Sequence, residues 1–381
     1  MKQTARIFLF AIFLAFAVSC GSDRKGASAD VSIDTFATKS NVSFFKDVFT
    51  DIRAIPLDLD GHVLGAHHGL RLRISDGRYV LTDMQSKSVY AFGRDGGLLT
   101  YISKEGRGPG EYTSLLTCEY VDHKYVVLAE SGHIIEYDGQ GSMVREFFLE
   151  QELMDMLFVD AGTPVLVVSR IEGDEAAEQD RILVCDADYK PQHSFCPLGF
   201  QLFNYDNHLS AVAGCDGEFL YVEPTATRFL RCNKEGVLHS CDVDLQGKGF
   251  PKSFLESVDW EKILEVLMKT PDLYCYNSVF ENDRYYLLSL EHIVSGNETE
   301  RGQWLVRKED GSSRVEYIDE DGTLFAFLGL PLLLTEQDEI VYVLDMDMYG
   351  AVADDIPELA AVLDGLDVPE GGAVLLVCKI A

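Results

Sequence analysis

A pair of short apolar runs recurs along the chain from residue 52 onward, and this repeat constrains the fold more than any other feature. The first run of each pair is rich in Val, Leu, Tyr and Phe, and turn signals such as Asp76-Gly77 precede several of these runs. The six first runs are Tyr79–Asp83, Tyr125–Glu130, Val165–Arg170, Phe219–Pro224, Tyr285–Leu290 and Ile340–Asp345. Five second runs end at Phe92, Tyr137, Cys185, Cys232 and Arg307, at spacings of 45, 48, 47 and 75 residues.

This spacing is typical of a β-propeller, in which units of about 40–50 residues with about four short strands each form blades around a ring. Six pairs therefore predict an all-β fold with six blades. The alternative is a β-sandwich whose spacing is coincidental. Because an open ring would expose unpaired strand edges, we expect the terminal runs Ile52–Asp58 and Ala373–Ile380 to complete one blade together.

Two segments have helical periodicity instead. In residues 252–270, apolar side chains recur at helical spacing, at Phe254, Leu255, Val258, Ile263, Leu264 and Leu267. This pattern predicts a helical insertion, which would account for the interval of 75 residues. A second, short helix is predicted at Pro357–Leu366.

The first residues have the pattern of an export signal. Lys2 and Arg6 precede an uncharged apolar run, Ile7–Val18, which is too short to span a bilayer because spanning needs about 20 apolar residues. Such a run is typical of a signal peptide. The residues that follow, Ala17-Val18-Ser19-Cys20, resemble a lipobox, which predicts a signal peptide over residues 1–19 and lipid, including palmitate, on Cys20. The alternative is an ordinary signal peptide with an incidental thiol at residue 20.

The segment after Cys20 predicts a tether. Residues 20–45 are rich in Ser, Ala, Asp and Lys and lack periodicity, so we expect a flexible tether followed by the propeller over residues 46–381. Lipid on Cys20 would attach the protein to a membrane of the cell envelope, which we expect to be the outer membrane. The residues after Cys20, with Asp23 before Arg24 and Lys25, leave open whether the propeller faces the periplasm or the cell surface.

Charge excludes one class of partner. Cleavage before Cys20 removes Lys2 and Arg6 but no acidic residue, which leaves 30 Lys and Arg against 63 Asp and Glu. Nucleic-acid binding depends on basic side chains that neutralise phosphates, so no nucleic-acid partner is expected. The acidic residues are scattered, and we interpret them as a solvated surface.

Eight cysteines follow Cys20, and most of them stand where a strand would carry a core residue, such as Cys185 and Cys232. Disulfides are permitted in an exported protein, but a free cysteine also packs as a small apolar residue. We expect the second role for most of them. No CxxC pair is present, so a zinc site of that type is unsupported.

The segment Ser103–Tyr112 (SKEGRGPGEY) predicts a shaped loop, because glycine allows unusual backbone angles and Pro109 fixes the middle of the turn. Arg107, Glu111 and Tyr112 are the candidate binding residues of this loop. The alternative is an ordinary turn in which Glu111 and Tyr112 brace the neighbouring blade.

This loop motif, together with VYAFGRDGGLLTYI before it and GGAVLLVCKIA at the end of the chain, resembles the six-bladed β-propeller lipoproteins of Gram-negative bacteria, which are relatives of NHL-repeat propellers. The resemblance covers nearly the whole mature chain. It implies a six-bladed propeller on a lipid anchor, but it implies no general activity.

Recognisable catalytic motifs are absent from the sequence: there is no P-loop, G-x-S-x-G or H-E-x-x-H. His62, His67 and His68 could suggest metal ligands, but a solvated loop is the preferred interpretation. Asp345 and Asp347 imitate only the start of a calcium loop. We therefore expect no catalytic residue, metal or cofactor.

The leading functional hypothesis is a binding or scaffold module for a peptide, glycan or protein partner. The competing hypothesis is an NHL-like, metal-dependent lyase or hydrolase. That enzyme would need histidines or carboxylates from three or more blades to converge at the ring axis.

Overall fold

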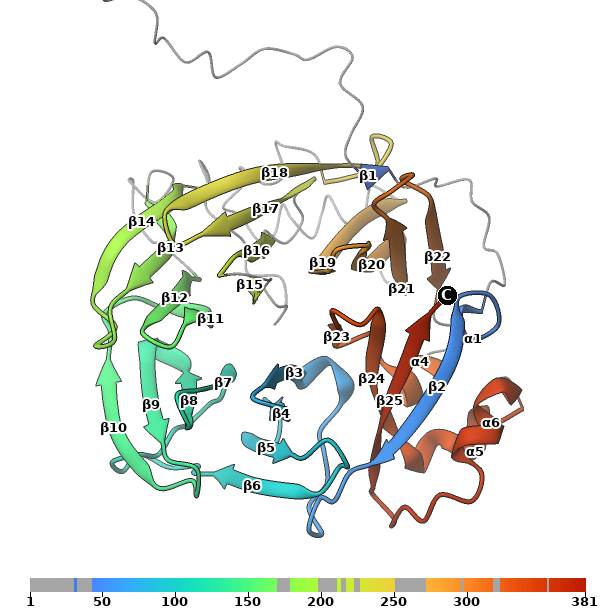
Figure 1. Ribbon diagram of the computed structural model, residues 1–381, viewed down its shortest axis with the longest axis horizontal. Helices are drawn as coiled ribbons and strands as arrows, with labels where there is room; N and C mark the ends of the chain where they lie inside the picture. The colour runs from blue at the N-terminus through green and yellow to red at the C-terminus, as the bar shows by residue number, and fades with distance from the viewer. Residues whose placement is uncertain are drawn as a thin grey trace, which may run out of the picture.

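The computed structural model describes residues 31–32, 43–169, 179–197, 211–213, 217–222, 227–250, 272–295, 298–317, 323–354 and 356–381. In this part of the chain six sheets form a ring (Figure 1). Each sheet is one blade, and its strands lie side by side from the centre of the ring outward (Figure 1). The protein is therefore a six-bladed β-propeller, as the repeat predicts.

Consecutive strands of each blade pair antiparallel, from the centre outward. Blade 1 contains β3 (Leu70–Ser75), β4 (Arg78–Asp83), β5 (Ser88–Phe92) and β6 (Leu98–Ser103), and blade 2 contains β7 (Thr117–Val121), β8 (Lys124–Ala129), β9 (His133–Tyr137) and β10 (Met143–Phe148). Blade 3 contains β11 (Leu153–Asp160), β12 (Thr163–Val168), β13 (Asp180–Cys185) and β14 (Pro191–Pro197). Blade 4 contains β15 (Ala211–Ala213), β16 (Phe219–Val222), β17 (Arg228–Asn233) and β18 (Gly236–Asp244). Blade 5 contains β19 (Leu273–Glu281), β20 (Tyr285–Ser295), β21 (Glu298–Arg307) and β22 (Ser313–Tyr317).

Blade 6 closes the ring with strands from both ends of the chain. It contains β23 (Leu333–Leu334), β24 (Glu339–Asp345), β25 (Ala373–Ile380) and, outermost, β2 (Phe49–Pro56). The ladder between β2 and β25 is antiparallel and places Ile52 opposite Cys378. The predicted closure is thus confirmed.

The predicted pairs of runs are the two middle strands of the blades. The first runs match β4, β8, β12, β16, β20 and β24, and the second runs match β5, β9, β13, β17 and β21. Side-chain hydrogen bonds stabilise the turns that follow several second runs. The Asp138 carboxylate accepts hydrogen bonds from the backbone N–H groups of Gln140 and Ser142, both at 2.9 Å. One blade later, the Asp186 carboxylate accepts hydrogen bonds from the backbone N–H groups of Asp188 and Lys190, both at 3.0 Å. These turns recur because a short Asp side chain can replace a backbone acceptor.

The apolar core lies between neighbouring blades. Val80 and Ala91 of blade 1, for example, form one buried cluster with Tyr125 and Ile135 of blade 2. Most cysteines occupy such positions, as predicted: Cys118, Cys185, Cys232, Cys241, Cys275 and Cys378 are buried, and Cys196 is half-buried.

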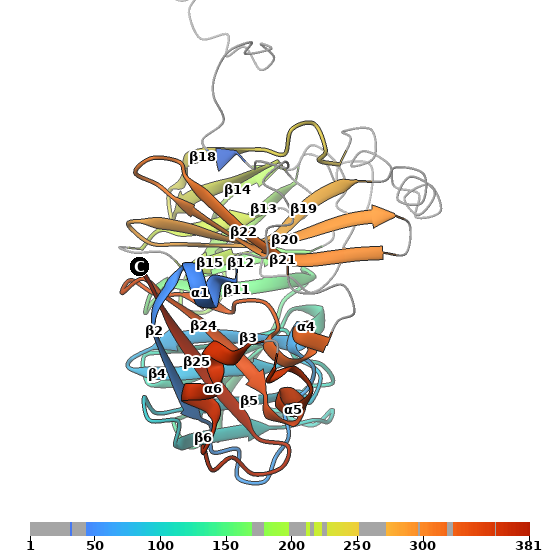
Figure 2. The ribbon, with the colours of Figure 1, turned by 90° about the vertical axis from the view of Figure 1, so that its right-hand side faces the viewer.

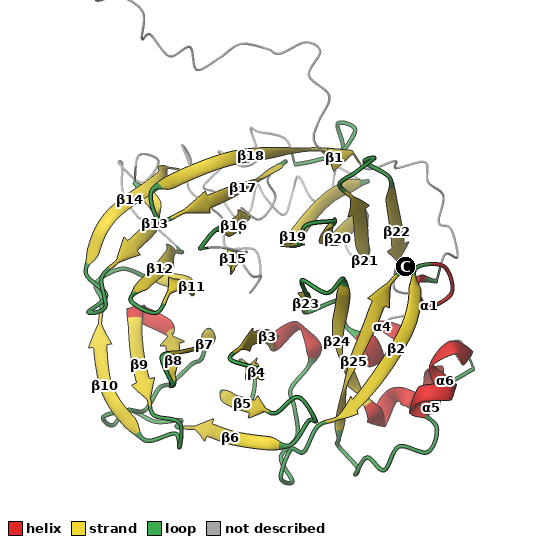
Figure 3. Ribbon diagram, in the orientation of Figure 1, coloured by secondary structure: helices red, strands yellow, loops and turns green. Residues whose placement is uncertain are grey.

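Helices gather beside blade 6 (Figure 3). They are α1 (Phe44–Asp47), α4 (Thr323–Leu328), α5 (Tyr349–Val352) and α6 (Pro357–Leu363). Helix α6 confirms the short helix predicted at Pro357–Leu366, although it ends three residues earlier. Single 3₁₀ turns lie at His67–Gly69, Glu130–Gly132 and Met346–Met348.

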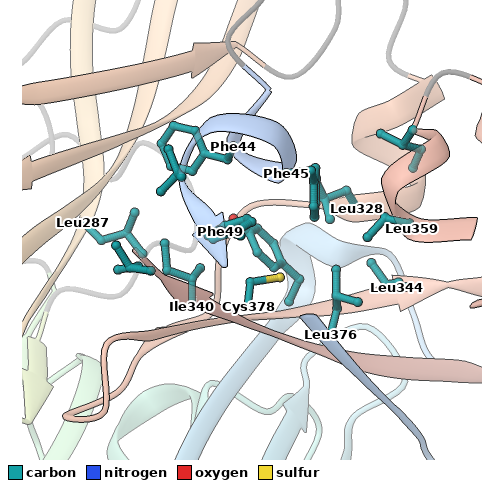
Figure 4. Close-up of a cluster of buried hydrophobic side chains, with 14 of the residues drawn as sticks. Phe44, Phe45, Phe49, Leu287, Leu328, Ile340, Leu344, Leu359, Leu376 and Cys378 are labelled. Atoms are coloured by element: carbon teal, nitrogen blue, oxygen red, sulfur yellow. The ribbon is translucent and has the colours of Figure 1, made fainter. Parts of the chain in front are cut away.

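The N-terminal segment contacts the ring earlier than residue 46, the predicted boundary between tether and propeller. Helix α1 lies between blades 5 and 6 (Figure 2), and Phe44 and Phe45 are buried there in a cluster that includes Leu287 of blade 5 and Leu376 of blade 6 (Figure 4). The strand β1 (Val31–Ser32) pairs in parallel with β18 at the outer edge of blade 4. Strand β1 lies within the range for which a flexible tether is predicted. It contacts the ring there, and the apolar side chain of Val31 is buried.

Three predicted segments lie outside the described residues: the signal peptide over 1–19, the lipid-attachment residue Cys20 and the helical insertion over 252–270. Within the described ranges, the helices are all too short or too polar to cross a membrane.

Candidate functional site

The innermost strands of blades 1 to 3 carry charged side chains at the ring axis. Strand β3 places Arg71 and Arg73 two residues apart, and Leu72 between them is fully buried. Because successive side chains of a strand point to opposite faces, both arginines lie on one face of β3. Strand β7 contributes Glu119, and β11 contributes Asp155. We call Arg71, Arg73, Glu119 and Asp155 the axial cluster.

The register of the blades explains why these side chains meet. Arg73 lies opposite Val80 of β4, and Glu119 lies opposite Val126 of β8. Val80 and Val126 each follow the tyrosine that starts the apolar run of the second strand. Arg73 and Glu119 therefore occupy equivalent positions on neighbouring inner strands and face each other across the seam.

Ion pairs connect the three blades at the axial cluster. Nε of Arg73 donates to Oε1 of Glu119 at 2.7 Å, and Nη1 of Arg71 donates to Oδ1 of Asp155 at 3.3 Å. Nη2 of Arg73 lies 3.8 Å from the same oxygen of Asp155. The Asp155 side chain is 0% exposed, so its charge depends on these partners and on the backbone N–H of Met156 at 2.8 Å.

Burial governs the proton affinities of the axial cluster. It lowers the pKa of Arg71, and the nearby Asp155 carboxylate opposes this effect without cancelling it. Burial also raises the pKa of Glu119, although Arg73 opposes the rise. For Arg73 itself, burial lowers the pKa, but the charge of Glu119 and that of Asp155 outweigh it, so its pKa is raised. With all four groups charged, the two guanidinium groups balance the two carboxylates.

Thr117 adds a hydroxyl group beside the axial cluster. It stands two residues before Glu119 on β7, so both side chains lie on the same face of that strand. Thr117 is fully buried, and its hydroxyl oxygen has no hydrogen-bond partner in the described part of the protein. Buried hydroxyl groups are usually paired. The Thr117 hydroxyl is therefore available to form a hydrogen bond with a ligand.

The predicted binding loop lies elsewhere, between blades 1 and 2. The hydroxyl group of Tyr112 donates to the carbonyl of Lys87 at 2.9 Å, and the residue is only 1% exposed. The Glu111 carboxylate accepts a hydrogen bond from the backbone N–H of Gly108 at 2.8 Å, inside the loop. Tyr112 therefore contacts blade 1, Glu111 bonds within its own loop, and the Arg107 side chain is exposed.

The histidine and aspartate candidates serve local structure. The ring of His62 stacks on Tyr101 with centroids 4.0 Å apart, and Nε2 of His67 is 2.8 Å from the carbonyl of Ala326. The Asp345 carboxylate accepts the backbone N–H of Asp347 at 3.0 Å. No group of three metal-ligating side chains suited to a metal ion is found among the residues that the structure describes.

The apolar runs of the sequence do not predict the axial cluster, because they identify only the two middle strands of each blade. A signal was available in LRLRIS, the sequence of β3, where arginines alternate with apolar residues. Isolated acids in the short apolar runs of β7 and β11 gave the same signal. Only the ring topology shows that these three strands meet.

Comparisons with known proteins place the chain in a family. The family described as "Domain of unknown function (DUF4934)" matches residues 31–366, and the chain belongs to this family. A candidate exported protein of Bacteroides fragilis has a similar structure, with 16% sequence identity, a TM-score of 0.68, and coverage of 88% of this chain and 97% of that one. A DUF4221 family member of Bacteroides vulgatus shares 11% identity at a TM-score of 0.54, covering 88% and 98% of the two chains. These likenesses show the fold. No curated protein matches the sequence.

Proposed function

We propose that this member of the DUF4934 family is an exported binding module, attached to the outer membrane through lipid on Cys20, whose axial cluster contacts a peptide or glycan ligand. The axial cluster is the observation that carries this proposal. It brings four charged side chains from three blades to one place.

Stability alone is a weak reason for the axial cluster. Replacing buried ion pairs with apolar side chains of similar volume is often neutral or stabilising. The guanidinium groups of Arg71 and Arg73 supply donors, and the carboxylates of Glu119 and Asp155 supply acceptors. A neutral ligand with hydroxyl or amide groups could bond to both kinds of group, and to Thr117, without disturbing the balance of charge.

The enzyme hypothesis fits the axial cluster less well. Carboxylates do converge at the axis, as that hypothesis requires, but Asp155 and Glu119 face guanidinium groups at 3.3 Å and 2.7 Å. A divalent cation bound there would be repelled by two positive charges at short range. The arrangement therefore favours binding over metal-dependent catalysis.

Export and lipidation rest on the first twenty residues. The run Ile7–Val18 and the lipobox-like residues before Cys20 support a cleaved, lipidated precursor. The description of the Bacteroides fragilis relative as a candidate exported protein agrees with this proposal. Cys20→Ala should move the protein from the membrane fraction to the soluble fraction, and unchanged membrane association would contradict lipid anchoring.

Binding can be tested with the mature chain, residues 20–381, on a printed glycan array and on a tripeptide library. We expect at least one ligand that binds the native protein and loses about tenfold or more in affinity with Arg73→Leu. The matched control is Arg53→Leu, because Arg53 is half-exposed on blade 6 and pairs with Glu339 at 2.7 Å. Equal loss in both variants, or turnover of the ligand by a metal-loaded protein, would contradict the proposal.

A further inference from the structure

A pocket separate from the axial cluster opens at the seam between blades 4 and 5. Blade 4 contributes the residue before β16, the first two residues of β16 and one residue of β17, and blade 5 contributes the last residue of β19, the turn after it and the residue after β21. The lining residues are Glu218, Phe219, Leu220, Arg231, Glu281, Asn282, Asp283 and Lys308. Five of these eight side chains are ionisable.

Two cations share one carboxylate in this pocket. Glu281 has a side chain that is only 9% exposed, and it contacts both Nη2 of Arg231 and Nζ of Lys308. The ammonium group of Lys308 also donates to the backbone carbonyl of Asn282 at 2.5 Å. One carboxylate of Glu281 thus holds both the Arg231 guanidinium group and the Lys308 ammonium group in place.

Two further carboxylates flank the cations. Oε2 of Glu218 lies 3.4 Å from Nη1 of Arg231, on the blade 4 side. Asp283 stands on the exposed turn of blade 5. The pocket therefore places two cationic groups among three carboxylates, and the buried side chain of Leu220, which belongs to the apolar cluster between blades 4 and 5, provides an apolar contact.

We propose that this pocket binds a small zwitterion, namely a free α-amino acid. Its carboxylate contacts Arg231 and Lys308, and its ammonium group faces Glu218 or Asp283. A small side chain such as a methyl group lies against Leu220. The proposal is independent of the axial cluster and of lipid on Cys20.

The pattern of charges argues against ligands with a single charge. An anion attracted to Arg231 and Lys308 would also approach Glu218 and Asp283, and a cation attracted to those carboxylates would approach the two basic groups. Like charges brought close together near a protein surface repel each other. A molecule that carries both charges a few bonds apart avoids both costs.

Calorimetric titration of the mature chain with L-alanine tests the proposal. We expect L-alanine to bind, and we expect L-alaninamide and N-acetyl-L-alanine each to bind about tenfold more weakly or not at all. Equal binding of N-acetyl-L-alanine would reveal a simple anion site, and equal binding of L-alaninamide a simple cation site. Either outcome, or no heat with about 10 mM L-alanine, would overturn the proposal.

Variants locate the binding within the pocket. Arg231→Gln should abolish alanine binding, and Asp283→Asn should weaken it while leaving the fold intact, because Asp283 is exposed. The control is Arg228→Gln, which removes an exposed cation on the same strand outside the pocket. Binding that survives both pocket variants, or is lost in the control, would also overturn the proposal. Loss of glycan or peptide binding at the axial cluster would leave these results unchanged.

Discussion

Oε1 of Glu316 accepts a hydrogen bond from the backbone N–H of Phe44 at 3.0 Å. This contact joins the outermost strand of blade 5 to the first residue of α1, which leads into β2 and the closing blade. Nε2 of Gln303 donates to the other oxygen of Glu316 at 2.6 Å, and the hydroxyl group of Tyr342 in blade 6 in turn contacts Gln303. The closure of the ring thus depends partly on one half-buried carboxylic acid.

Glu316 should make the stability of the protein depend on pH. Burial raises its pKa to about 7, against the opposing hydrogen bonds from Gln303 and Phe44. The folded state then binds this proton more tightly than the unfolded state, whose pKa is near 4.5. The free energy of unfolding should therefore fall as the pH rises from about 5 to about 7, by at most about 3 kcal/mol. Urea unfolding at several pH values measures the change.

Glu316→Gln is the control for this dependence, since an amide keeps the shape of the side chain but cannot ionise. The variant should lose the decline between about pH 5 and 7 that Glu316 causes. An identical decline in the variant and the native protein would assign the effect to other groups.

Val31 should stabilise the ring although it lies within the predicted tether. Its side chain is 1% exposed and belongs to the apolar cluster between blades 4 and 5. Val31→Asp should lower the free energy of unfolding by about 1–3 kcal/mol. Ser32→Asp, at the exposed neighbour in β1, should change it by less than about 0.5 kcal/mol. Equal effects of the two substitutions in urea unfolding would mean that β1 does not dock on β18.

Strong apolar patterning is the reason that the fold was predictable. The middle strands of the blades are nearly continuous apolar runs, as in β8, where five consecutive residues are buried. The strands next to the axis were harder to see, because β23 has two residues and β3 carries two arginines. Val31 was missed because a two-residue strand has no periodicity and becomes recognisable only from its partner in β18.

The candidate site was less predictable than the fold for a related reason. The glycine-rich segment at Gly106–Gly110 is conspicuous in the sequence, but a conspicuous turn can serve packing as well as binding. Tyr112 is used internally. Arg73 and Glu119 are 46 residues apart in the chain, so their meeting depends on the register of two separate blades.

Tyr112 should contribute to stability through its hydroxyl group. Burial raises the pKa of this phenol, so it remains protonated and donates to the carbonyl of Lys87 at neutral pH. Tyr112→Phe should therefore cost about 1 kcal/mol, whereas Arg107→Ala in the exposed part of the same loop should cost almost nothing. Thermal unfolding monitored by circular dichroism distinguishes them, and a cost for Arg107→Ala as large as that for Tyr112→Phe would contradict the brace.

The most direct test of the binding proposal is the affinity of the double variant Arg73→Leu with Glu119→Leu for a ligand found on the glycan array or in the peptide library. The double variant removes the guanidinium group and the carboxylate together, so neither is left buried without its partner. The free energy of unfolding should therefore stay within about 1–2 kcal/mol of the native value. The account predicts a folded protein whose affinity falls by about tenfold or more. Unchanged affinity in the folded double variant would contradict the assignment of binding to the axial cluster.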